Sequence, residues 1–154
     1  MMKLCSEVLK VLEGKTLCTA ESLTGGGIGA ALTAVPGASK VFKGGIISYT
    51  DEVKREVLGV SQSDLDAFGA VSASVAQAMA QGARKLLRAD VAISVTGLAG
   101  PDGDTLGHEV GTVFIGYADE RNVTVGEYLF TGDREAVRNQ TVEAAIRLIL
   151  ENIK

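Results

Sequence analysis

The sequence predicts a three-layer α/β/α sandwich with a mixed, mostly parallel sheet, and three observations favour this fold class. Short apolar runs typical of strands alternate with amphipathic segments typical of helices along most of the chain. Late in the chain, two strand-like runs at 110–118 and 123–130 follow each other directly, as expected for an antiparallel hairpin. The chain has 154 residues, 46% of them apolar, which fits one domain over 1–154 with a single core.

Helix-capping residues and glycines mark where the predicted helices begin and end. Apolar residues at helical spacing from Leu4 to Leu12 predict a first helix, which Gly14 ends. Ser, Thr and Asp residues precede most later helices, and such residues accept hydrogen bonds from the first backbone amides of a helix. The first half is therefore expected to contain a strand at 16–19, a helix at 25–34, a strand at 43–49 and a helix at 52–58 with Asp51 as N-cap.

The second half continues this alternation. A short helix through Ala67 is expected to be capped by Ser61 or Ser63, and Ser72 starts a longer helix with a clean apolar stripe. A buried-type strand at 90–95 follows, then a loop rich in Gly and Asp at 96–109. After the hairpin, Asp133 caps a final helix that reaches about residue 152.

Composition and charge exclude several classes of function. The net charge is −4, so the chain has no overall basic field for nucleic acid. The N-terminal segment carries Glu7 and Glu13 and lacks the pattern of a signal peptide, and no apolar run approaches the roughly 18–20 residues that cross a bilayer. We therefore expect a soluble cytoplasmic protein with no membrane partner. Because small α/β layers often bury an apolar face against a copy, we also expect a homo-oligomer.

The sequence gives little support for metal binding or redox chemistry. Cys5 lies in the first helix and Cys18 in a strand, so both are interpreted as small buried hydrophobic residues in a reducing compartment. One histidine, His108, and two distant cysteines do not make a recognisable zinc site. We therefore expect no metal and no cofactor, and we treat His108 as non-catalytic.

Ser22, Tyr49 and Lys54 are the main catalytic candidates. Ser22 lies between a strand and a glycine-rich helix start, Tyr49 ends the second strand, and Lys54 lies in the first turn of the next helix. In open α/β sheets, sites form at the carboxyl ends of the strands. A hydroxyl and an amine gathered there can form a Ser–Lys hydrolytic site. The helix dipole would favour the neutral lysine that acts as a base. The alternatives are a capping serine and a solvated lysine.

Glycines and arginines supply the candidate binding residues. Backbone amides around Thr24, Gly25 and Gly26 could stabilise an oxyanion. Thr96, Gly97 and Gly100 follow a buried strand, where glycines allow a close approach to a ligand, although a tight turn is the alternative. Arg134 and Arg138 lie one helical turn apart and could bind a phosphate, unless they form a solvated helix face.

The glycine run has a competing interpretation. Residues 25–30 (GGGIGA) fit the relaxed dinucleotide-binding pattern, with Asp51 near the end of the next strand. The fit is weak, because the segment ESLT at 21–24 stands between the strand and the first glycine. This reading predicts a nicotinamide-dinucleotide oxidoreductase.

Taken together, the motifs resemble the CinA C-terminal domain family, also called the nicotinamide-nucleotide amidase family. The matching segments are AESLTGG at 20–26, VPG at 35–37, GGIISY at 44–49 with Lys54, LGV at 58–60, GAVS at 69–72, VTGLAGP at 95–101, GTV at 111–113 and GDR at 132–134. They cover nearly the whole chain, in the order of the family. The second domain of longer members has no counterpart here, so the chain looks like the stand-alone form.

The resemblance implies hydrolysis of nicotinamide mononucleotide to nicotinate mononucleotide and ammonia. It implies Ser22 as nucleophile, Lys54 as catalytic lysine and Tyr49 as an assisting residue. Two departures stand out: Leu23 replaces the usual cysteine, and the loop 102–109 differs from the usual Gly/Thr/Pro-rich version. A catalytically silent nucleotide-binding or interaction domain of the same fold is the alternative.

Overall fold

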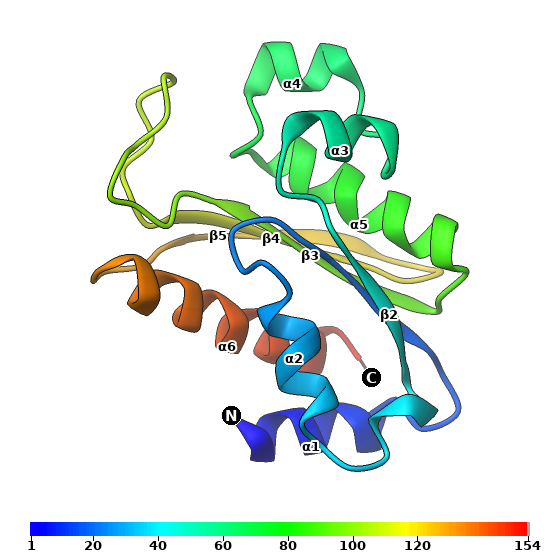
Figure 1. Ribbon diagram of the computed structural model, residues 1–154. Helices are drawn as coiled ribbons and strands as arrows, with labels where there is room; N and C mark the ends of the chain where they lie inside the picture. Colours follow the sequence, from blue (N-terminus) through cyan, green and yellow to red (C-terminus); the bar gives the residue numbers. More distant parts are fainter. Residues whose placement is uncertain (154) are drawn as a thin grey trace.

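A five-stranded sheet organises the chain in the computed structural model, which describes residues 1–153 (Figure 1). The strands lie in the order β2-β1-β3-β4-β5, and their bounds are β1 Leu17–Glu21, β2 Phe42–Ile47, β3 Val91–Gly97, β4 Thr112–Ala118 and β5 Val123–Leu129. β1 pairs in parallel with β2 and β3, whereas β3–β4 and β4–β5 pair antiparallel. Every strand except β4 therefore runs in the same direction, and the predicted mixed, mostly parallel sheet is confirmed.

Helices cover both faces of the sheet, which gives the three predicted layers (Figure 1). α1, α2 and α6 pack together on one face, and α5 packs on the other face with α3 and α4 above it. The bounds are α1 Met2–Val11, α2 Gly27–Thr33, α3 Asp51–Glu56, α4 Gln62–Phe68, α5 Ala73–Leu87 and α6 Arg134–Asn152, with a 3₁₀ turn at Ala38–Lys40.

Two large apolar clusters form most of the core, one on each face, and a small third cluster consists of Val71, Ala76 and Phe114. Leu17, Ile93 and Ile115 pack towards α1, α2 and α6, whereas Cys18 and Ala92 pack towards α5. The alternation follows the two-residue period of strands, and because both faces are covered, β1 and β3 are buried along almost their whole length. Cys5 and Cys18 are buried free thiols, as expected, and burial raises the pKa of Cys18 to about 12.

Most of the helix N-caps predicted from the sequence are confirmed. Ser61, Ser72 and Asp133 each accept a hydrogen bond from a first-turn amide, at the starts of α4, α5 and α6. The predicted cap Asp51 is wrong: Thr50 Oγ1 accepts from the Val53 amide, and Asp51 is the first helical residue. Thr50 takes this role because its backbone is extended, as N-caps require.

The sheet brings the candidate residues to one edge. Ser22 follows β1, Ser48 and Tyr49 follow β2, and the long loop after Gly97 follows β3. Because these three strands are adjacent and parallel, their carboxyl ends meet at the same edge. Over the described residues, no helix has the length and hydropathy of a membrane-crossing segment.

Candidate active site

A cavity of about 700 Å³ opens at this edge of the sheet. One wall comes from the turns after β1 and β2, and the other comes from the α4–α5 turn and the loop after β3. The cavity is lined by Ser22, Leu23, Tyr49, Asp51, Lys54, Leu65, Asp66, residues 69–71, residues 96–102, residues 104–106 and Arg134. The candidate nucleophile and amine therefore share one cavity with four of the eight predicted binding residues: Thr96, Gly97, Gly100 and Arg134.

Lys54 and Ser22 are in direct contact at the floor of this cavity. Lys54 Nζ lies 3.0 Å from Ser22 Oγ, and it also donates to the carbonyls of Ser48 at 2.8 Å and Tyr49 at 3.1 Å. The lysine is 1% exposed and the serine 7% exposed. No ion pair involves Lys54 among residues 1–153. Lys54 is therefore a buried amine held by neutral oxygens, not a solvated surface cation.

This environment changes the protonation of Lys54. Burial lowers its pKa to about 8 from the ordinary 10.5, and the negative charge of Asp51 acts weakly in the opposite direction. With Thr50 as the cap, Lys54 is the fourth helical residue and not the third. The expected neutral amine is thus explained mainly by desolvation rather than by the helix dipole.

The hydrogen-bond partners of Lys54 suit a role as a general base. A neutral amine has two N–H groups and one lone pair. The carbonyls of Ser48 and Tyr49 can accept both N–H groups, which leaves the lone pair for the hydroxyl hydrogen of Ser22. Such a lysine can accept the serine proton and so activate the nucleophile.

Ser22 does not cap a helix. α2 begins only at Gly27, and its N-cap is Gly26, which supplies no side-chain cap. Gly25 and Gly26 have φ angles of 57° and 102°, a region that favours glycine, and they turn the chain sharply before the helix. The serine therefore remains free to contact Lys54, and the capping alternative is wrong.

Glu21 is the functional candidate that the sequence analysis missed. Its carboxylate accepts hydrogen bonds from Thr24 Oγ1 at 2.7 Å and from the amides of Ile28 at 2.8 Å and Gly29 at 3.0 Å. The signal was an acidic residue directly before the serine, within reach of the positive end of a glycine-rich helix start.

This contact contradicts the dinucleotide-binding interpretation. Amides in the first turn of α2, which would hold a pyrophosphate, are bonded to the carboxylate of Glu21. A negative charge already occupies the position where a phosphate would bind. Neither Gly25 nor Gly26 lines the cavity.

The predicted oxyanion segment does not line the cavity. The amide of Gly25 donates to the carbonyl of Ser22 at 3.1 Å, and the hydroxyl of Thr24 donates to Glu21. Thr24, Gly25 and Gly26 all lie outside the cavity lining, whereas Leu23 belongs to it. Leu23 is also buried in the core, so its side chain packs the turn that carries Ser22.

Tyr49 contacts Lys54 through its backbone. Its carbonyl accepts from Lys54 Nζ, whereas its side chain is 58% exposed and its hydroxyl contacts Arg134 at 3.3 Å. The phenol therefore lies at the mouth of the cavity and the carbonyl at its floor.

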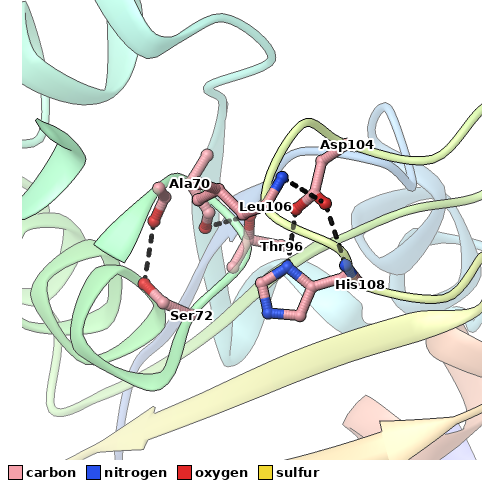
Figure 2. Close-up of polar contacts among 7 residues, drawn as sticks. Ala70, Ser72, Thr96, Asp104, Leu106 and His108 are labelled. Carbon is pink, nitrogen blue, oxygen red and sulfur yellow. Dashed lines mark hydrogen bonds and ion pairs between the residues drawn. The ribbon is translucent and has the colours of Figure 1, made fainter. Parts of the chain in front are cut away.

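The segment after β3 forms the opposite wall. Thr96 Oγ1 donates to the carbonyl of Ala70 at 2.8 Å and ties β3 to the α4–α5 turn (Figure 2). Gly97 lines the cavity, but a Cβ atom there would come within 2.6 Å of the Thr112 carbonyl. Close packing against β4 thus requires this glycine. The carbonyl of Gly100 accepts from Arg134 Nη1 at 2.7 Å.

The two candidate arginines have different positions. Arg134 lines the cavity and joins Gly100 to Tyr49 across it. Arg138 does not line the cavity, because it donates to the carbonyls of Leu23 at 2.9 Å and Thr24 at 3.1 Å. Arg134 can therefore contact a ligand in the cavity, whereas Arg138 holds the turn that carries Ser22.

A side-chain clasp shapes the loop 102–109. Asp104 accepts from the amides of Leu106 and His108, and its second oxygen lies 2.6 Å from Nδ1 of His108 (Figure 2). Burial acts to raise the pKa of Asp104, but the hydrogen bonds from His108 and Leu106 hold it below its usual range. Asp104 lines the cavity and His108 does not, so His108 acts on the loop.

The fold and this site define a three-layer α/β protein with a buried Ser–Lys pair at the carboxyl edge of its sheet. Within that class, the profile of the CinA C-terminal domain matches residues 2–153, and the chain belongs to this family.

Relatives and solved structures agree with the assignment. A CinA-like protein of Thermotoga neapolitana is 41% identical over 140 residues, which cover 91% of this chain and 34% of the relative. A CinA-like protein of a Synechococcus strain is 58% identical over 114 residues, which cover 73% of this chain and 27% of the relative. The chain thus spans about a third of the length of the curated relatives it matches first.

A crystal structure of a CinA superfamily protein from Klebsiella pneumoniae superposes with a TM-score of 0.96 at 36% identity. The match covers 99% of this chain and 96% of that one. A superfamily member from Enterobacter cloacae gives a TM-score of 0.97 at 31% identity, over 99% of this chain and 92% of that one.

Proposed function

We propose that this chain hydrolyses the carboxamide of nicotinamide mononucleotide, giving nicotinate mononucleotide and ammonia through a Ser–Lys acyl-enzyme. The main support is the 3.0 Å contact between Lys54 Nζ and Ser22 Oγ, made by a buried lysine whose pKa is lowered to about 8. The choice of substrate comes from the resemblance of the sequence motifs to the amidase family.

The acylation step uses both members of the pair. Neutral Lys54 takes the proton of Ser22 as Oγ attacks the amide carbon, and a tetrahedral intermediate forms. Protonated Lys54 then gives this proton to the amide nitrogen, the carbon–nitrogen bond breaks, and ammonia leaves. The products are neutral Lys54 and an ester between Ser22 and the nicotinoyl group.

Water completes the reaction. Lys54 takes a proton from the water that attacks the ester carbon, and it returns the proton to Ser22 Oγ as the ester bond breaks. The carbonyls of Ser48 and Tyr49 keep the amine in place through both steps, because they bind it in either protonation state.

We assign the developing oxyanion to the backbone amide of Leu23, the residue after the nucleophile. Leu23 lines the cavity, and its amide has no hydrogen-bond acceptor among residues 1–153. The amide of Gly25 is bonded to Ser22. Removing one oxyanion donor typically lowers the rate ~10²–10³-fold.

Arg134 is the group proposed to bind the phosphate. It is the only arginine among the described residues that line the cavity, and it lies at the mouth beside the phenol of Tyr49. A guanidinium can bind a phosphate through two parallel hydrogen bonds. The ring and its amide would then point inward towards Ser22.

The test is an ammonia assay with a second nucleophile present. The purified chain is given nicotinamide mononucleotide, free nicotinamide or a simple aliphatic amide, with and without hydroxylamine. The proposal predicts ammonia from the mononucleotide above all, and partition of the acyl group between acid and hydroxamate. If the folded chain releases no ammonia from any of them, it is not this amidase, and the silent-domain alternative gains support.

A further inference from the structure

We infer that Glu21 is a positioning residue for the proposed reaction: its buried carboxylate holds the turn that places Ser22 against Lys54. The inference rests on the proposed function, but its physical basis is a separate hydrogen-bond network. Glu21 touches neither the cavity nor Lys54, so it acts through Ser22 and not on the substrate.

The carboxylate of Glu21 is fully satisfied without a cation. Oε1 accepts from Thr24 Oγ1 at 2.7 Å and the Ile28 amide at 2.8 Å, and Oε2 accepts from the Gly29 amide at 3.0 Å and Thr19 Oγ1 at 3.2 Å. The residue is 2% exposed, and no arginine, lysine or histidine pairs with it among residues 1–153. Burying a carboxylate is costly unless such hydrogen bonds are made, so the network favours one geometry of the turn.

The four donors come from both sides of Ser22. Thr19 precedes the serine on β1, whereas Thr24, Ile28 and Gly29 follow it. The carboxylate therefore closes the turn between β1 and α2 across its base. Ser22 sits within this closed turn, and the position of its Oγ depends on the network.

The backbone of Glu21 reaches the other half of the pair. Its carbonyl accepts from the Ser48 amide at 2.7 Å and from Ser48 Oγ at 3.3 Å. The carbonyl of Ser48 in turn accepts from Lys54 Nζ at 2.8 Å. One residue thus links the turn of the nucleophile to the segment that holds the base. A shift of this turn by about 1 Å can lower a rate ~10²-fold.

The test replaces Glu21 by Gln and by Asp. In Glu21→Gln, one carboxylate oxygen becomes an NH₂ group that faces two donors, so the turn must shift. We expect kcat to fall ~10–100-fold, KM to stay within about twofold because the cavity lining is unchanged, and the pH profile to keep its midpoint near 8. Glu21→Asp keeps the charge and should restore part of kcat.

Asp119→Asn is the matched control. The carboxylate of Asp119, like that of Glu21, accepts several hydrogen bonds: from Tyr117 Oη and from the amides of Arg121 and Asn122. Asp119 lies at the opposite end of the sheet from the cavity. This variant should lose stability without a loss of kcat. A comparable fall of kcat in the control would overturn the inference.

Labelling separates positioning from folding, and it does so without the substrate. A fluorophosphonate that modifies active serines is used to measure both the fraction of labelled Ser22 and the labelling rate. We expect Glu21→Gln to label completely but ~10–100-fold more slowly. Wild-type labelling rate in Glu21→Gln, or a lower labelled fraction that accounts for the whole loss, would refute the inference. Failure of the wild type to hydrolyse the nucleotide would refute the substrate alone, because the labelling comparison does not use it.

Discussion

The two walls of the cavity differ in how they are held. On one wall Ser22 and Lys54 are buried, and the Lys54 amine is bonded to the Ser22 hydroxyl and to two backbone carbonyls that directly follow β2. The opposite wall contains the loop 102–109, which is largely exposed and is shaped by the local clasp between Asp104 and His108. Under the proposed function, we therefore expect the buried wall to fix the reacting groups and the exposed wall to contact the rest of the ligand. Substitutions in the first should lower kcat, and those in the second should raise KM.

The largest expected effect comes from the amine. Lys54→Met keeps the apolar stem and removes the base, so turnover should fall on the order of 10³-fold or more. The rate of ammonia release measures this loss. Lys43→Met is the control, because Lys43 is an exposed lysine that donates to the carbonyl of Arg88. A Lys54→Met enzyme with a tenth of the wild-type rate would contradict the role of the amine as base.

Arg138, which supports the turn of Ser22 from outside the cavity, and Arg134, which bonds to Gly100 of the opposite wall, allow the two roles to be compared. Arg134→Gln should raise KM about tenfold with little change in kcat, because a charge-assisted hydrogen bond to the phosphate is lost. Arg138→Gln should instead lower kcat about tenfold, since its guanidinium holds the carbonyls of Leu23 and Thr24 beside the nucleophile. Steady-state kinetics of both variants measures this split. The same pattern in both would mean that the walls do not have separate roles.

The pH dependence should follow Lys54. In the proposed mechanism the neutral amine is the active form, and its pKa is about 8, so kcat/KM should rise as the pH increases through this value. Titration of a single group with this pKa makes the rate at pH 9 about tenfold higher than at pH 7. A profile that falls over this range would require a protonated lysine instead.

The smallest effect is expected in the exposed loop. Asp104→Asn replaces the carboxylate that contacts Nδ1 of His108 and weakens the clasp, but it leaves Ser22 and Lys54 in place. KM should rise about two- to threefold at unchanged kcat, consistent with the modest net energy of one side-chain hydrogen bond. Isothermal titration with the product, nicotinate mononucleotide, checks the same change in affinity. A tenfold loss of kcat would show that the loop takes part in the chemistry.

The fold could be predicted from the sequence because local patterns and the tertiary structure agree. The largely buried strands β1 and β3 are covered on both faces, and Ser72 and Asp133 cap helices as expected. Strand ends were less accurate: β2 stops at Ile47, so the carbonyls of Ser48 and Tyr49 are free to turn towards Lys54. Such backbone contacts leave no mark in the side-chain pattern.

The site was predicted unevenly for a related reason. Ser22 and Lys54 stood out because their chemistry and their places at strand ends coincide. Arg138 was expected at the phosphate and Tyr49 as an assisting residue, but the contacts that Arg138 and the Tyr49 phenol make depend on which groups meet across more than 80 residues of sequence. Glu21 was missed because a carboxylate bonded to amides and hydroxyls shows no charged partner in the sequence.

The most direct test of the account is ammonia release from nicotinamide mononucleotide by the wild type beside Ser22→Ala, at a pH above 8 where Lys54 is mostly neutral. Both proteins are first shown to unfold at similar temperatures, so that a loss of rate cannot come from misfolding. The account predicts steady release by the wild type and only background release by the variant. Release by Ser22→Ala at a substantial fraction of the wild-type rate would contradict a covalent reaction at Ser22.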